Sequence, residues 1–343
     1  MKKILGIGNA LVDVMIPVSD DNLLKKFSLP KGSMQLVDEE RSNLIKSETL
    51  NFKRTFSPGG SAANTIHGLA MLGAGTGFIG SIGKDDTGGI FEAEMKRAGV
   101  KTMLLRRDSI TGTAVALVSK NKERTFATHL GAAVELDAGE LNTDLFTDFD
   151  ILYLEGYLIN NLPLVESACN IAREKNMTIA LDLASYNVVE AYLNDFKKIV
   201  TNYIDIIFAN EDEARAFTGL LPEEAVKTLS DYCSIAVVKI GPAGSWLKKG
   251  EEIIKVDSLP VICKDTTGAG DLYASGFLYA YANDLELEKC GILGSMLAGN
   301  VIEVVGAKIK EEKWPVIKKY VSLLTKEKSN EEIHMIDKNH KHL

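Results

Sequence analysis

The chain has 343 residues, 45% of them hydrophobic and 25% charged, with a formal net charge of −8. This composition supports a large buried core, and the acidic balance argues against a nucleic-acid-binding protein, which needs a basic face. It does not exclude nucleotide substrates, because one basic group and a few amides can hold a phosphate. Cysteines stand only at positions 169, 233, 263 and 290, without a CxxC pair, and no uncharged apolar run is long enough to span a membrane. We therefore expect a reduced, cytoplasmic protein without zinc or disulfides.

The first part of the chain alternates strands and helices, with β-rich pieces between them. A buried strand is expected at 3–9, β-rich pieces at about 11–18, 33–38 and 54–57, a helix at 61–72, a strand at 76–82 and a helix at 88–98. Gly73 follows the first helix as a C-terminal cap. The segment 102–130 interrupts the alternation with two antiparallel strands joined around Asn121 and Lys122.

The rest of the chain keeps a regular α/β rhythm. Strands are expected at 150–157, 178–184, 204–209 and 235–240, separated by helices at about 163–175, 188–202, 211–218 and 222–232. A hairpin around Gly250 and three helices, at about 268–283, 287–304 and 312–326, precede a charged tail at 331–343. This alternation predicts a three-layer α/β/α domain over 1–330 with a mostly parallel sheet. The β-rich interruptions, about 11–57 and 102–130, are expected to pair as a small β-sheet lid.

The segment from Asp265 to Asp271, DTTGAGD, precedes an apolar helix and carries the clearest chemical signal. Two glycines around one alanine leave backbone N–H groups uncovered at a helix start, which forms an anion site. Asp271 in that first turn is placed to accept a proton from a hydroxyl that attacks a phosphate. The alternative is an aspartate that only stabilises the helix start. A Walker A motif and a dinucleotide fingerprint are both missing.

Three ordered segments together resemble the PfkB, or ribokinase-like, family of carbohydrate and nucleoside kinases. They are GNALVD from Gly8 to Asp13, GGSAAN from Gly59 to Asn64, and DTTGAGD. The resemblance covers the chain to about residue 327. It implies a ribokinase-like fold, ATP and Mg²⁺ as cofactors, and a small-molecule substrate.

The resemblance also implies roles for matching positions. The implied catalytic residues are the base Asp271, the anion site of Gly268, Ala269 and Gly270, and Arg124 at the ATP phosphates. The implied substrate residues are Asp13, Gln35, Gly59, Gly60, Asn64 and Tyr157. The implied nucleotide residues are Asn210, Lys239, Gly241, Gly244, Thr266 and Asn300, with Glu213 holding Mg²⁺ through water. From the residues alone, structural roles are favoured for Asp13, Gly60, Asn64 and Arg124, as a strand end, a tight turn, a helix start and a solvated hairpin arginine.

Within the family the likeness is strongest to adenosine kinases, where Gln35 and Tyr157 would lie beside the nucleoside base. Two departures are GGSAANT in the first signature and Asp182, which stands where those enzymes carry an uncharged residue. The leading hypothesis is an ATP-dependent kinase of a nucleoside 5′-hydroxyl. A kinase of ribose, fructose or another free sugar, and a non-catalytic ligand-binding regulator, stay open. Monomer and homodimer are also both open.

Overall fold

The computed structural model describes residues 1–120 and 124–325 and contains a nine-stranded and a five-stranded sheet. The larger sheet has the order β14-β13-β12-β11-β10-β9-β1-β5-β6. Its strands are β1 (Ile4–Ile7), β5 (Thr76–Gly83), β6 (Lys101–Arg107), β9 (Ile151–Glu155), β10 (Thr178–Asp182), β11 (Ile206–Asn210), β12 (Ile235–Lys239), β13 (Ser245–Lys249) and β14 (Glu252–Val256). Only the hairpin strands β13 and β14 pair in antiparallel fashion. The predicted α/β class with a mostly parallel sheet is confirmed.

Helices cover both faces of the larger sheet, because its central strands are apolar on both sides. One face packs against α3 (Ser61–Leu72), α4 (Asp86–Arg97), α10 (Ala269–Ala282), α11 (Leu287–Ile302) and α12 (Trp314–Thr325). The other packs against α5 (Leu162–Glu174), α6 (Tyr186–Ala191), α7 (Leu193–Tyr203), α8 (Glu211–Thr218) and α9 (Pro222–Leu229). Side chains that alternate along β1 divide between the two cores: Ile4 joins the first, and Leu5 and Ile7 join the second.

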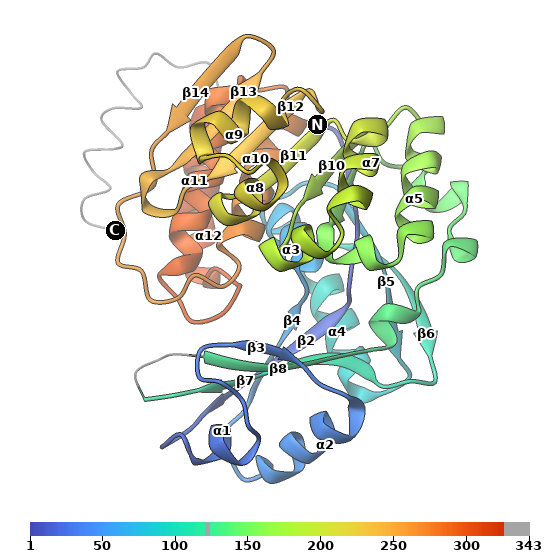
Figure 1. The fold of residues 1–343 in the computed structure, drawn as a ribbon, viewed down its shortest axis with the longest axis vertical. Coiled ribbons are helices and arrows are strands. Elements are labelled where there is room, and N and C mark those ends of the chain that lie inside the picture. The colour runs from blue at the N-terminus through green and yellow to red at the C-terminus, as the bar shows by residue number, and fades with distance from the viewer. Residues whose placement is uncertain (121–123, 326–343) are drawn as a thin grey trace.

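The smaller sheet lies at one end of the molecule (Figure 1) and has the order β3-β8-β7-β2-β4. Its strands are β3 (Met34–Leu36), β8 (Arg124–Gly131), β7 (Thr111–Val118), β2 (Leu11–Pro17) and β4 (Thr55–Gly59). Helices α1 (Asn22–Lys26) and α2 (Glu39–Glu48) lie beyond it in the same view. The two β-rich interruptions therefore pair in space, as expected.

Some elements differ from the sequence prediction. Strand β6 overlaps the start of the predicted second lid segment, yet it extends the larger sheet beside β5. Helices α1 and α2 were not predicted, and the helix expected at 188–202 is two helices that meet at Tyr192. The turn at Asn121 and Lys122 and the tail at 331–343 lie outside the described residues. Within the described ranges, no helix has the length and apolarity needed to cross a membrane.

Candidate active site

Two predicted nucleotide residues, Asn210 and Lys239, lie at the carboxyl edge of the larger sheet, where Asp182 also lies. Asp182, Asn210 and Lys239 end three neighbouring parallel strands, β10, β11 and β12. Strand β1 lies between β9 and β5. The next strands of this sheet along the chain, β5 and β6, are added on one side of β1, and β9 to β14 are added on the other side. Ligands of open α/β sheets bind outside the carboxyl ends of the strands at such a switch point.

Asp271 lies in the first turn of α10 and connects the two signature segments. Ser61 Oγ donates a hydrogen bond to Asp271 Oδ1 (2.7 Å), and Asn64 Nδ2 donates one to Oδ2 (2.9 Å). Burial raises the pKa of Asp271 to about 6, against the two hydrogen bonds, which lower it. A carboxylate with this pKa is a better proton acceptor near neutral pH than an exposed aspartate.

The turn before α10 is shaped by a glycine with a left-handed backbone. Gly268 has a φ of 75°, and a side chain there would collide with Ala307, whose Cα would be 2.8 Å from the added Cβ. Ala269 and Gly270 begin the helix, whose first N–H groups have no partner within the helix. The N–H of Ala269 donates to Thr266 O, in the loop before the helix (3.1 Å). These amides and the positive end of the helix dipole can hold a phosphate.

Arg124 connects the smaller sheet to the turn before α10. It begins β8, is buried, forms an ion pair with Asp265, and donates a hydrogen bond to Thr267 Oγ1 (2.8 Å). Both partners belong to the DTTGAGD segment. The guanidinium therefore lies beside the anion site, although β8 and α10 are far apart in sequence.

Two polar groups near Asp271 have no partner among the residues that the structure describes. No hydrogen bond reaches the Asp13 carboxylate, and the buried Asn64 Oδ1 accepts none. Burial raises the pKa of Asp13 to about 7, and the negative charge of Asp271 adds to this rise. Both groups are free to bind the hydroxyls of a substrate.

Glu155 is a site residue that the sequence analysis missed. Its buried carboxylate, at the end of β9, accepts hydrogen bonds from the backbone N–H groups of Asn9 (2.9 Å) and Ala62 (2.8 Å). Burial raises its pKa to about 7. Beside it, Gly60 has a φ of 94° and lies against the carbonyl oxygen of Asn9. Glu155 therefore joins the end of β1 to the start of α3. An acidic residue ending the otherwise apolar run ILYLE was the available signal.

Asn210 and Glu213 form a capping box at the start of α8. Asn210 Oδ1 accepts from the backbone N–H of Glu213 (2.9 Å), and Asn210 Nδ2 donates to Glu213 Oε1 (2.6 Å). Burial and the charge of Asp182 raise the pKa of Glu213 to about 7. Over the described part of the chain, no three His, Cys, Asp or Glu side chains form a metal-binding group. These oxygen donors fit a Mg²⁺ ion held chiefly by phosphates and water, with Glu213 as its outer partner.

The other predicted nucleotide residues are more dispersed. Gly241 and Gly244 form the turn after β12, where Gly244 (φ 94°) lies against the carbonyl oxygen of Val256. Thr266 is exposed in the loop before α10. Asn300 donates to Met296 O (2.9 Å) within α11 and accepts from Lys313 Nζ (3.3 Å), and neither of these partners is a predicted site residue.

Of the two residues expected at the base, only Tyr157 lies near the site. Its hydroxyl group donates to Ala184 O (3.4 Å), and burial together with the charges of Glu155 and Asp271 raises its pKa. Gln35 is on the wrong face of the smaller sheet. In the strand register Asp13 is aligned with Leu36, so their side chains share one face of the sheet. Gln35 is aligned with Val14, so it belongs to the other face, which α2 covers. The register thus contradicts the predicted role of Gln35.

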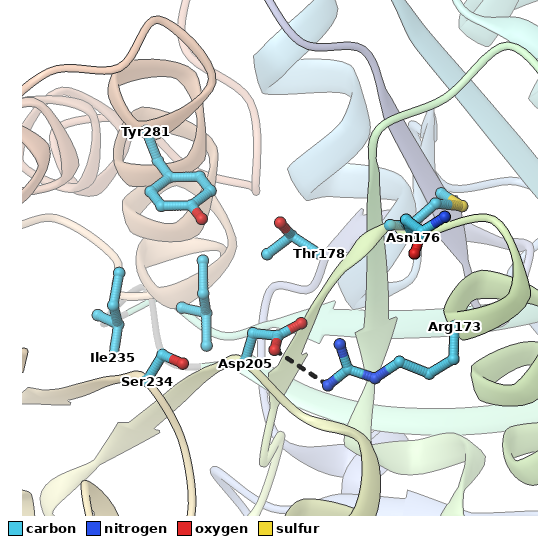
Figure 2. A pocket seen from close by; sticks show the side chains of 9 residues that line it. Arg173, Asn176, Thr178, Asp205, Ser234, Ile235 and Tyr281 are labelled. Carbon is cyan, nitrogen blue, oxygen red and sulfur yellow. Dashed lines mark hydrogen bonds and ion pairs between the residues drawn. The ribbon is translucent and has the colours of Figure 1, made fainter.

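A separate cavity of about 320 Å³ lies at the opposite edge of the larger sheet (Figure 2). Thr178, Ile206 and Ile235, which line it, are the first residues of β10, β11 and β12. Arg173 and Asp205 form an ion pair at its wall (3.0 Å). Because the predicted site residues end these same strands, the cavity is not part of the site described above.

A glycine-rich helix start with a carboxylate in its first turn, at the carboxyl edge of a doubly covered sheet, is an arrangement suited to phosphoryl transfer. The pfkB family carbohydrate kinase model matches residues 33–314. The chain belongs to this family and is a phosphotransferase.

Individual relatives carry two kinds of name. An uncharacterised sugar kinase of Archaeoglobus fulgidus is 30% identical, over 70% of this chain and 96% of its own length. Adenosine kinase of Saccharomyces cerevisiae is 28% identical, over 90% of this chain and 96% of its own length. The crystal structure of adenosine kinase from Sinorhizobium meliloti has a TM-score of 0.83 and 31% identity, covering 93% of this chain and 99% of the other. The ribokinase-like fold is thereby confirmed.

Proposed function

We propose that this enzyme transfers the γ-phosphoryl group of ATP to the 5′-hydroxyl of a nucleoside, with adenosine as the leading candidate. The observation that carries this choice is the apolar face of the smaller sheet. Met15, Met34, Leu36 and Phe126 share the face of Asp13 in the strand register. Met34 and Leu36 are 48% and 65% exposed. An exposed apolar surface beside a hydroxyl-binding aspartate suits a planar base attached to a ribose.

In the proposed reaction, Asp13 and Asn64 orient the nucleoside, and Asp271 accepts the proton of the attacking hydroxyl. The hydroxyl oxygen forms a bond to the γ-phosphorus, while the bond to the bridging oxygen breaks and its electron pair stays on ADP. The amides of Gly268, Ala269 and Gly270 and the guanidinium of Arg124 hold the phosphate oxygens. When bound, Mg²⁺ would neutralise phosphate charge, with Glu213 and Asn210 ordering its water ligands.

A free sugar is the second candidate substrate, since one of the relatives above is named a sugar kinase. A free sugar presents hydroxyl groups on every side and needs polar partners for each of them. The methionines, leucine and phenylalanine beside Asp13 supply no such partners. On the same face Thr128 is buried, and Arg124 is engaged with the DTTGAGD segment. This contrast favours the nucleoside.

The test measures ADP release with ATP and Mg²⁺ against adenosine, inosine, ribose, fructose and fructose phosphates. We expect the highest kcat/KM with adenosine and AMP as the product. If ribose or fructose were turned over with a kcat/KM at least tenfold above that of adenosine, the nucleoside assignment would be wrong and the sugar assignment right.

A further inference from the structure

Asp182 and Lys239 form a buried ion pair at the carboxyl edge of the sheet. Their carboxylate oxygen and ammonium nitrogen are 2.8 Å apart, and their side chains are only 6% and 13% exposed. The second oxygen of Asp182 accepts from the backbone N–H of Ala184 (2.9 Å), a non-glycine residue with a φ of 67°. Both oxygens of Asp182 are thus engaged, and the carboxylate holds the ammonium in one place.

The ammonium of Lys239 lies at the anion turn. A Cβ built on Gly270 would be 3.2 Å from Lys239 Nζ, so the nitrogen lies next to Gly270, the residue that precedes Asp271. An ammonium group has three N–H donors. Asp182 is its one hydrogen-bond partner in the part of the chain that the structure describes, so two donors are available to a ligand.

Taking two charges out of water is unfavourable unless their geometry and hydrogen bonds are good. A buried ion pair at this position therefore calls for a functional explanation. Burial lowers the pKa of Lys239, but the carboxylates of Asp182 and Glu213 raise it more, so the lysine stays charged at neutral pH. A fixed positive charge at an anion site is worth most when charge develops on the bound group during the reaction.

Resting on the phosphotransferase function above, we propose that Lys239 contacts the phosphoryl group during its transfer and that Asp182 positions the lysine. Lys239 is then a catalytic residue. Its side chain acts on the transferred group, whereas the neighbouring glycines only let the backbone come close to ATP. Asp182 acts only through Lys239. The proposal also gives a function to Asp182, which stands where adenosine kinases carry an uncharged residue.

The test compares Lys239→Met, Asp182→Asn and the double variant, with Lys249→Met as control, because Lys249 is an exposed lysine of the adjoining strand β13. We expect Lys239→Met to lower kcat about 10²- to 10³-fold with a KM for the acceptor within threefold of the parent. Asp182→Asn should lower kcat about tenfold, and the double variant should match Lys239→Met. The double variant removes both buried charges, so it also provides a folded protein if Lys239→Met alone is unstable.

A purely structural pair predicts another result: activity would return in the double variant once the unpaired charge is gone, and this would overturn the proposal. A kcat within threefold of the parent in Lys239→Met would also overturn it. The second readout is the dissociation constant of MgADP with and without aluminium fluoride, which mimics the phosphoryl group in transfer. We expect fluoride to tighten binding in the parent and not in Lys239→Met. Equal tightening in both proteins would refute the role of Lys239.

The adenosine assignment can fail without affecting the test of Lys239. If the parent enzyme prefers another acceptor, the same variants are assayed with that acceptor, and the predicted ratios are unchanged. If no tested acceptor is phosphorylated, the aluminium fluoride measurement decides the role of Lys239 by itself.

Discussion

Asp271 combines three features that a base for phosphoryl transfer needs: a position in the first turn of α10, two hydrogen-bond donors that orient it, and a pKa raised to about 6. We expect Asp271→Asn to lower kcat by about 10²–10⁴-fold, the usual contribution of a general base. Nucleoside binding, measured by calorimetry, should stay within a few-fold of the parent. Asp284→Asn, just beyond the other end of the same helix, is the matched control, and its kcat should not change.

The same carboxylate sets the acid side of the pH profile. A base must be ionised to act, so kcat/KM of the parent should fall about tenfold per pH unit below about 6. A profile that stays flat down to pH 4.5 would show that Asp271 has the pKa of an ordinary exposed carboxyl, and the proposed environment would be wrong.

Asp13, the proposed hydroxyl-binding residue, is expected to lower the stability of the fold at neutral pH and above. Its pKa is raised from 3.8 to about 7 by burial, so the folded state binds the proton more tightly than the unfolded state. The favourable contribution is present below about pH 4 and is lost as pH rises through 7. At pH 8 we therefore expect Asp13→Asn to raise the free energy of unfolding by on the order of 1 kcal/mol. The gain should vanish at pH 4, and KM for the nucleoside should rise. Urea denaturation at both pH values measures this, and an equal effect at both would contradict it.

Among the elements, α3 depends on how Gly60, the residue just before the helix, packs against the segment that follows β1. Gly60 has a φ of 94° and lies against the Asn9 carbonyl, whereas Gly73, at the other end of α3, has a φ of 100° and open space around it. We expect Gly60→Ala to lower the free energy of unfolding by about 2–4 kcal/mol, from strain and collision together. Gly73→Ala, with strain alone, should cost about 1 kcal/mol. Equal losses of unfolding free energy in the two variants would mean that the close approach of Gly60 to the Asn9 carbonyl is unimportant.

How far the sequence predicts these elements depends on whether the signal is local. Helix α3 was predicted with the observed bounds, because its apolar spacing and Gly73 lie within one short segment. Strand β6 was taken as part of the lid, since which sheet a strand joins is decided by tertiary pairing. Gln35 was placed at the base although the register turns it away, because a one-residue difference exchanges the two faces of a strand. The hydrogen bonds of Glu155 join residues more than ninety positions apart, and no local pattern encodes them.

At the scale of the molecule, the site is made where the two sheets meet. The smaller sheet contributes Asp13 and Arg124, the larger one Asp182 and Lys239, and α10 contributes Asp271, the proposed base. The contacts of Arg124 with Asp265 and Thr267 show that the face of the smaller sheet bearing Arg124 is the one turned toward the anion turn. Arg124, Phe126 and Thr128 alternate along β8, so they share this face, and through the strand register Leu36 and Asp13 share it too.

This arrangement predicts opposite outcomes for neighbouring residues of β3. Leu36→Asn should raise KM for adenosine about tenfold, the usual cost of losing one apolar contact with a substrate, while kcat changes little. The folded protein should be equally stable, because Leu36 is 65% exposed. Gln35→Ala, one position away on the other face, should leave KM within twofold. Steady-state kinetics of both variants measure the difference, and a larger effect of Gln35→Ala than of Leu36→Asn would mean that the base binds on the other face of the sheet.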